Sequence, residues 1–251
     1  MKSISIAFNA DSLTIPICYH HQVQGLIYSL LRQGSGEALH DDSLDFGLRQ
    51  YKLFTFSSLR GGKIISKQKS LYFMRSAYLD VRSVRPEFCD ALIAGLNSGH
   101  ELSLYGQGIT ISSFSTQTTT LSENRLRLKM LSPLTIHRTD EDGHTCYLTP
   151  LDSDFADEIS KNFIRKYYAF TGQEPSDSIG IRAISLGAKD KYVTLYKKAL
   201  NLGEKDIYIT GWRGEYELCG RPEYINFLYY CGLGARNSDG FGMFESIDPT
   251  C

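Results

Sequence analysis

The feature that most restricts the fold is the order in which strand-like and helix-like segments follow one another. Residues 3–10 alternate apolar and polar side chains, as a half-buried strand does, and residues 23–33 form an apolar helical pattern closed by glycines. A second helix is predicted at 85–99, where a proline begins the pattern and a glycine ends it. The rest of this half predicts a short helical turn at 37–40 and strands at 51–60, 63–81 (one or two strands) and 101–116.

The second half repeats this order of elements without repeating the sequence. Helices are predicted at 153–172 and 222–232, and strands at 126–138, 179–187, 191–203, 206–220 and 240–247. A β-α-β-β-α-β order is the ferredoxin-like pattern. We therefore predict an α+β protein of two tandem ferredoxin-like (RRM-like) domains packed side by side. The polar stretch 115–125 is a plausible joint, which gives domains at 1–120 and 121–251.

Composition indicates an ordinary globular protein of the reducing cytoplasm. The 251 residues are 42% hydrophobic, and no segment approaches the roughly 20 apolar residues that span a bilayer. The six cysteines are scattered, without a CxxC pair or a cysteine–histidine cluster. We expect reduced thiols, a cytoplasmic location, no membrane contact, no cofactor and no metal site.

Charge is segregated along the chain although the formal net charge is only −1. Residues 46–79 contain seven lysines and arginines and no acidic residue, whereas acidic residues concentrate at 139–143 and 152–158. A solvated face is the plain interpretation of such a basic run. A polyanionic partner is the alternative, because a neutral total does not exclude a local basic surface.

Near the end, "CGLGARNSDGFGMFE" (231–245) concentrates four glycines in one short run. It is not a dinucleotide-binding motif, because only nine residues follow Gly242, too few for the helix that would carry the pyrophosphate. It is not a P-loop either, since no GK[ST] is present. A helix cap at Gly232 and a turn at "NSDG" account for some of the glycines but leave Gly234 and Gly242 unexplained.

The run "GLGARNSDGFG" resembles the C-terminal glycine-rich loop, GxGxxxxxGxG, of the repeat-associated RNA-binding protein superfamily of CRISPR systems. The chain is most similar there to the Cas-six type of precursor-RNA endoribonuclease. "PICYHHQVQGLIYSLL", "ALHDD", "YKLFTFSSL" and "SPLTIHR" stand in the order of that family. The resemblance implies a protein that binds CRISPR repeat RNA and cuts it without metal, leaving 2′,3′-cyclic phosphate and 5′-hydroxyl ends.

The resemblance also implies the catalytic residues. His40 occupies the general acid/base position, Tyr28 matches the tyrosine that positions the ribose or leaving group, and Lys52 matches the lysine that stabilises phosphorane charge. His20 and His21, expected just before the first helix, remain alternative catalytic residues, although packing or capping of that helix is the favoured interpretation. His137 is expected to be structural or to contact phosphate together with Arg138.

RNA contacts are expected along three basic segments and the terminal loop. We interpret the loop first as an RNA contact and second as a site of close packing. Trp212, the only tryptophan, is expected in the core in the first place and as a stacking platform in the second. The predicted RNA-binding residues are Arg60, Lys63, Lys67, Lys69, Arg125, Arg127, Lys129, Arg182, Lys191, Gly232, Gly234, Arg236, Asn237, Ser238, Gly240 and Gly242.

Two other functions stay open beside the endoribonuclease. One is a non-catalytic RNA-binding subunit of a CRISPR effector complex with the same fold. The other is a metabolic or regulatory ferredoxin-like protein with a small ligand, which the basic stretch and the terminal loop disfavour. Other CRISPR effector subunits are expected as further partners.

Overall fold

The computed structural model describes residues 1–35, 44–46, 49–187, 190–197 and 207–247, which divide into two compact units. Unit 1 comprises Met1–Asp42, Ser58–Thr118 and Thr194–Tyr208. Unit 2 comprises Ser43–Ser57, Thr119–Val193 and Ile209–Cys251. The segment 43–57, which carries Lys52, therefore belongs to the unit that contains the C-terminal half of the chain.

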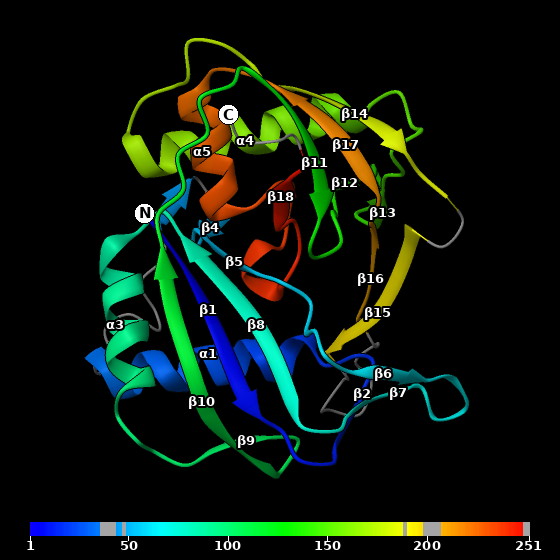
Figure 1. The fold of residues 1–251 in the computed structure, drawn as a ribbon. Coiled ribbons are helices and arrows are strands. Elements are labelled where there is room, and N and C mark those ends of the chain that lie inside the picture. The colour runs from blue at the N-terminus through cyan, green and yellow to red at the C-terminus, as the bar shows by residue number, and fades with distance from the viewer. Residues whose placement is uncertain (36–43, 47–48, 188–189, 198–206, 248–251) are drawn as a thin grey trace. The chain divides into compact units, whose positions relative to one another are not determined.

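Unit 1 is built on an antiparallel sheet whose central strand is β1 (Lys2–Asn9). It pairs with β8 (Ser76–Ser83) on one side and with β10 (Gln107–Gln117) on the other, and β9 (Leu102–Leu104) follows β10. The alternation in β1 buries Ile4, Ile6 and Phe8, as the period of two predicts. Figure 1 shows helices α1 (His20–Ser35) and α3 (Pro86–Leu96) together on one side of this sheet.

A second, smaller sheet of unit 1 carries the basic segment. Its three strands lie in the order β2 (Leu13–Pro16), β7 (Ser70–Phe73) and β6 (Lys63–Ile65), and the 3-10 turn η1 (Ser66–Gln68) connects β6 to β7. The predicted strand region 63–81 thus contains three strands rather than one or two. Lys69 takes a left-handed conformation (φ 47°) between the turn and β7, where the chain reverses.

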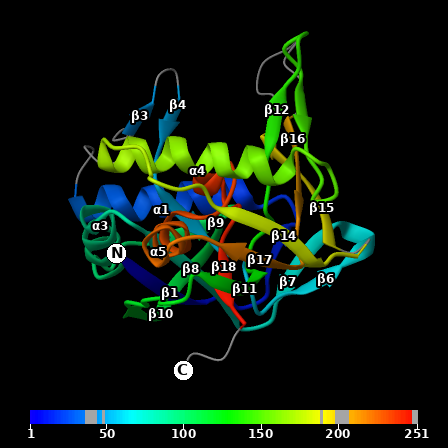
Figure 2. The ribbon, with the colours of Figure 1, turned by 90° about the horizontal axis from the view of Figure 1, so that it is seen from above.

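Unit 2 has a four-stranded antiparallel sheet in the order β14 (Gly180–Ser185), β17 (Glu215–Cys219), β11 (Arg125–Met130) and β18 (Phe244–Ser246). Helix α4 (Phe155–Thr171) follows β11 in sequence, and α5 (Pro222–Cys231) follows β17. The chain order is therefore the predicted β-α-β-β-α-β. Figures 1 and 2 show both helices on the same side of the sheet. The Phe163 ring of α4 packs against Tyr224 of α5, with ring centroids 5.1 Å apart.

The other elements of unit 2 are short. The pairs β3 (Leu44–Phe46)–β4 (Arg49–Tyr51) and β12 (His137–Thr139)–β13 (Thr145–Tyr147) form two antiparallel ladders. Strand β5 (Phe54–Phe56) and the 3-10 turn η3 (Asn237–Asp239) complete the unit. The boundaries between the units fall within β15 (Lys191–Lys197) and β16 (Ile207–Trp212).

Most predicted elements are found, with shifted ends. The first helix begins at His20 rather than near residue 23, so His20 and His21 lie in its first turn and not before it. The predicted strand 126–138 ends at Met130, because the following segment is irregular up to His137. The predicted turn at 37–40 lies outside the described residues. No helix in the described part of the chain is long and apolar enough to cross a membrane.

Candidate nucleic-acid interface

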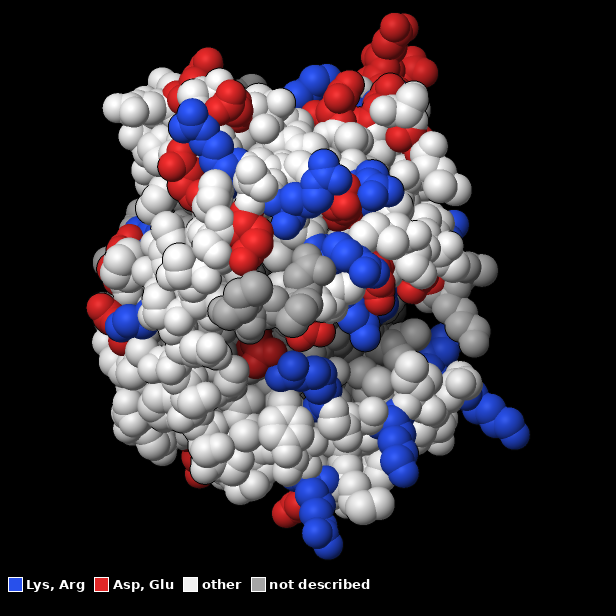
Figure 3. All heavy atoms as spheres, turned by 45° about the horizontal axis from the view of Figure 1, so that its top comes forward, with Lys and Arg blue, Asp and Glu red and all other residues white. Residues whose placement is uncertain are grey.

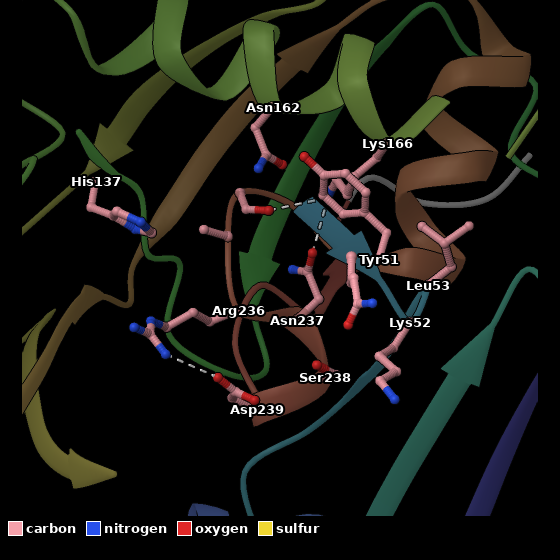
Figure 4. Close-up of a pocket in the computed structure, with 13 residues that line it drawn as sticks. Tyr51, Lys52, Leu53, His137, Asn162, Lys166, Arg236, Asn237, Ser238 and Asp239 are labelled. Atoms are coloured by element: carbon pink, nitrogen blue, oxygen red, sulfur yellow. Dashed lines mark hydrogen bonds and ion pairs between the residues drawn. The ribbon is translucent and has the colours of Figure 1, made fainter. Parts of the chain in front are cut away.

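A pocket of about 370 Å³ opens in unit 2, and its walls come from segments far apart in sequence. Gln50 to Leu53 form one wall, His137 of β12 and two residues of α4 form another, and the glycine-rich loop forms the floor. Figure 4 shows the side chains of Asn162, Tyr51 and Arg236 around this space. The residues that line it are Gln50, Tyr51, Lys52, Leu53, His137, Asn162, Lys166, Gly234, Ala235, Arg236, Asn237, Ser238 and Asp239.

Beneath the floor lies a buried lysine. Lys166 of α4 is only 2% exposed, and its ammonium donates to Gly232 O at 2.6 Å, Asn237 Oδ1 at 3.0 Å and Gly234 O at 3.1 Å. An ammonium group has three donors, so all of them are used on the loop. Burial lowers the pKa of Lys166 from its usual value, since desolvation disfavours the charged form.

Asn237 joins the loop to itself. Its amide nitrogen donates to Leu233 O at 2.8 Å and to Phe241 O at 3.0 Å, while its oxygen accepts from Lys166. The Thr55 hydroxyl also donates to Phe241 O, at 3.0 Å. Asn237, a predicted RNA donor, thus spends both amide hydrogens within the loop and is 9% exposed. Its direct contact with RNA stays a prediction.

The loop glycines have a packing reason in this arrangement. Gly242 has φ +81°, and a Cβ there would meet the backbone oxygen of Leu233. At Gly234, with φ +66°, a Cβ would meet the oxygen of Thr135. The close packing that the sequence ranked second is therefore present, with the loop glycines buried. Within the loop, Ala235, Arg236, Ser238 and Asp239 are partly exposed at the pocket, and Arg236 Nη1 lies 3.3 Å from Asp239 Oδ2.

The three predicted catalytic residues are not brought together within one unit of the structure. Tyr28 is half-buried on α1 of unit 1, whereas Lys52 lines the pocket of unit 2. His40 lies outside the described residues. Their joint action in one active site stays a prediction.

The alternative histidines have clear packing roles. His20 is fully buried, and its ring stacks on that of Tyr19 with centroids 4.8 Å apart. His21 is half-buried, lies 3.3 Å from the Gln22 amide nitrogen, and meets Tyr105 edge-on at 6.2 Å. Desolvation lowers the pKa of His21, against the opposing effect of the Cys18 carbonyl. These contacts agree with helix packing, the favoured interpretation of both residues.

The predicted basic residues of the unit 2 sheet share one exposed face. In β11 the apolar residues point inward, while Arg125, Arg127 and Lys129 point to solvent. The neighbouring strand β17 places two glutamates among them: Arg182 Nε lies 2.8 Å from Glu217, and Arg127 lies 3.5 Å from Glu215. The hydrogen bond from Arg182 lowers the pKa of Glu217. Figure 3 shows blue and red side chains interleaved on the face it displays, so this surface is mixed rather than uniformly basic.

The basic segment of unit 1 is more one-sided. Lys63, Lys67 and Lys69 are exposed along β6, η1 and the turn into β7. Arg60 is engaged with Asp80, at 2.7 Å between Nη2 and Oδ2. In unit 2, Lys191 at the start of β15 is also exposed. Their role in RNA binding stays a prediction.

The sequence prediction missed several pocket residues, among them Tyr51, Asn162 and Lys166. A signal for two of them exists in α4, whose buried positions are Phe155, Ile159, Asn162, Phe163 and Lys166. The helical period places a polar amide and a cation on the stripe that faces the core, where both need partners. For Tyr51 the sequence offers no comparable signal.

Two further predicted residues have contacts of their own. His137 is half-buried with its ring 5.7 Å from that of Tyr147, and Arg138 pairs with Asp154 at 2.6 Å. Trp212 is half-buried beside Leu134, with which it forms a β-bridge. Among the described residues, no three His, Cys, Asp or Glu side chains lie together as metal ligands would. The five described cysteines are free thiols.

The two units and the loop define the class of this protein: it has tandem ferredoxin-like domains and a glycine-rich loop that a buried lysine holds in place. Two family models match nearly the whole chain: "CRISPR-associated protein Cas6, N-terminal" at residues 14–115 and "CRISPR associated protein Cas6, C-terminal" at 116–246. The chain belongs to the Cas6 family of CRISPR-associated proteins. A relative from Methanocaldococcus jannaschii, named CRISPR-associated endoribonuclease Cas6 2, is 26% identical over 245 residues, which cover 90% of this chain and 91% of the relative.

Solved structures share the fold. A Cas6-related protein from Pyrococcus furiosus superposes with a TM-score of 0.81 at 21% identity, covering 99% of both chains. A structure described as "An RAMP protein binding different RNA substrates" has a TM-score of 0.79 at 18% identity, covering 99% of this chain and all of its own. The predicted α+β class with two tandem ferredoxin-like domains is thereby confirmed.

Proposed function

We propose that this chain is a metal-independent endoribonuclease that binds CRISPR repeat RNA and cuts the precursor transcript into guide RNAs. Membership of the Cas6 family supports RNA cleavage, because its curated relatives are named endoribonucleases. The structural relative described as binding RNA supports an RNA substrate. Other CRISPR effector subunits are proposed partners, and the cytoplasm is the proposed location.

One observation carries the proposal beyond family membership. The segment that contains Lys52 and the glycine-rich loop, 180 residues apart in sequence, meet at the same pocket. Lys52 and Arg236 bring two cations to it, and Ser238 adds a hydroxyl donor. Cations and hydroxyl donors are the groups that contact phosphate oxygens of a nucleic acid backbone.

The proposed reaction is attack of a ribose 2′-oxygen on the adjacent phosphorus with departure of the 5′-oxygen. A general base takes the 2′-proton and a general acid protonates the leaving oxygen. We assign this proton transfer to His40, because histidine is the side chain that most readily exchanges protons near neutral pH. Tyr28 orients the ribose or the leaving group. Lys52 stabilises the additional negative charge of the phosphorane, which develops only in the transition state.

The test is cleavage of repeat RNA in excess EDTA with analysis of the product ends. Wild-type protein should yield 2′,3′-cyclic phosphate and 5′-hydroxyl ends. His40→Ala should lower the single-turnover rate by about 100-fold or more while RNA binding is retained, and Lys52→Ala should lower it similarly when the RNA is saturating. Lys161→Ala is the matched control, because Lys161 is exposed on α4 and engaged with Glu158 at 2.8 Å, away from the pocket.

Each failure has its own meaning. Full activity of His40→Ala would transfer the role to His20 or His21, and cleavage abolished by EDTA would contradict the metal-independent mechanism. Tight binding without cleavage under any condition would identify a non-catalytic RNA-binding subunit. Absence of salt-sensitive RNA binding would refute the proposal altogether, since phosphate contacts release counterions.

A further inference from the structure

Three buried polar atoms around the pocket lack a partner within the described part of the chain. They are Asn162 Oδ1, the Tyr51 hydroxyl oxygen and Arg236 Nε. Asn162 is 4% exposed on the buried stripe of α4, and Figure 4 shows its amide directed from the helix toward the pocket. Buried polar groups nearly always find hydrogen-bond partners. Unsatisfied atoms that converge on one cavity therefore indicate a ligand that supplies the missing donors and acceptors.

The pocket has the size and chemistry for a nucleobase. Its volume of about 370 Å³ falls within the range of roughly 300 to 1,000 Å³ of small-molecule sites. The ring of Tyr51 and the imidazole of His137 lie on different sides of this space in Figure 4 and add two aromatic side chains to its lining. Sequence-specific RNA recognition uses unstacked bases held between aromatic side chains and read by hydrogen bonds on their edges.

We propose that this pocket is a nucleotide subsite that receives one base of the RNA, extruded from the strand, with Asn162 as the residue that reads its edge. The Asn162 oxygen accepts from an exocyclic amino group, and the Tyr51 hydroxyl bonds to the same nucleotide. The two cations at the mouth, Lys52 and Arg236, hold its phosphate. This subsite rests on the proposed RNA function and adds to it a base-specific contact.

A side-chain amide presents one acceptor, its oxygen, beside one donor, its NH2 group. It therefore pairs best with a base edge that has a donor next to a ring-nitrogen acceptor. On the Watson–Crick edge, adenine and cytosine carry that arrangement. The preferred nucleotide at the subsite is thus one with an exocyclic amino group next to an unprotonated ring nitrogen.

The test is a cycle of variants in protein and RNA, read by equilibrium binding of catalytically silenced protein (His40→Ala in every sample). Repeat RNAs that are abasic at one position in turn locate the nucleotide. Asn162→Leu should weaken binding of the intact RNA by about 10-fold, and the abasic RNA should bind wild-type Asn162 protein about 10-fold more weakly. When the Asn162→Leu protein binds the abasic RNA, the loss of affinity should be no larger than with either change alone, because both changes remove the same contact.

Two controls separate recognition from folding. Asn162→Leu replaces an amide whose buried oxygen lacks a partner by an apolar group of similar size, so its melting temperature should equal or exceed that of wild type. Gln173→Leu, an exposed amide just beyond α4, should leave RNA binding unchanged. Tyr51→Phe should show a smaller loss at the same nucleotide.

Several outcomes would overturn the subsite. The proposal is wrong if the affinity losses from the protein change and the RNA change add up. It is also wrong if Asn162→Leu lowers the melting temperature, or if abasic substitution has the same effect at every position. In those cases wild-type protein still binds and cuts RNA, so the proposed function stands. Failure of wild-type protein to bind RNA would instead be a failure of that function.

Discussion

Replacing Lys166 by methionine tests whether the buried lysine holds the glycine-rich loop. Methionine has a similar length and flexibility but no donor. The change leaves three buried acceptors, Gly232 O, Gly234 O and Asn237 Oδ1, without the ammonium that now reaches them at 2.6 to 3.1 Å. Unit 2 should lose stability, and the loop should lose its fixed conformation.

The magnitude follows from two opposing contributions. Hydrogen bonds to a charged group contribute about 1.5 to 3 kcal/mol each, and three are removed. Desolvation of the ammonium, which costs several kcal/mol, is also removed. Since acceptors that remain buried without a donor are costly, we expect a net loss of about 3 kcal/mol, or about 6 to 12 °C in melting temperature.

Thermal unfolding can be followed by the fluorescence of Trp212, the only tryptophan of the chain. Trp212 lies in the part of β16 that belongs to unit 2, so its signal reports on the unfolding of unit 2. Lys161→Met on the exposed face of the same helix is the matched control and should unfold within about 1 °C of wild type. A melting temperature of Lys166→Met equal to that control would refute the reasoning. It would mean that relief of desolvation fully offsets the lost hydrogen bonds.

Three further predictions concern other positions. Gly242→Ala should destabilise unit 2 far more than Gly143→Ala, since both have positive φ but only Gly242 has a backbone oxygen in the path of a Cβ; thermal unfolding of both variants measures the difference. Under a short maleimide pulse, the exposed thiol of Cys146 should be labelled, whereas Cys231, whose pKa burial raises to about 11, should react only after unfolding, as peptide mass mapping would show. The folded-state pKa of His21 lies below its usual value near 6.5, so the unfolded chain binds more protons and stability should fall as pH drops from about 6.5 toward 5; His21→Gln should weaken this dependence.

Each of these predictions can fail clearly. Equal melting temperatures for the two glycine variants would remove the packing argument for the loop. Labelling of both thiols at the same rate would show that the helix end around Cys231 opens readily. An unchanged pH dependence in His21→Gln would assign the acid sensitivity to other groups.

The local elements were within reach of the sequence because their signals are local. The alternation of apolar and polar residues correctly predicted the strand β11. The proline at the start and the glycine after the end correctly predicted the helix α5. The predicted start of the first helix was too late in the sequence. No Ser, Thr, Asp or Asn cap stands just before His20 to mark the start, and a histidine gives no sign in the sequence that its ring will be buried in the core. The order of elements then fixed the fold class.

The glycine-rich loop shows where local signals stop. Its glycines stood out in the sequence, but only the fold shows which groups crowd them: Thr135 O at Gly234, the Thr55 Cβ at Gly232 and Leu233 O at Gly242. Charge patterning likewise identified the arginines of β11 but not Glu215 and Glu217 of the adjacent strand, because strand register sets those pairs.

By itself, the sequence determined the α+β class, the tandem ferredoxin-like order and the family resemblance, since periodicity, caps and short motifs are properties of neighbouring residues. Only the tertiary structure decided that Lys52, Asn162 and Arg236 surround one pocket and that a buried lysine holds its floor. Such juxtapositions depend on how sheets and helices pack across long stretches of chain. The pocket and its unsatisfied polar atoms exist only in the folded protein.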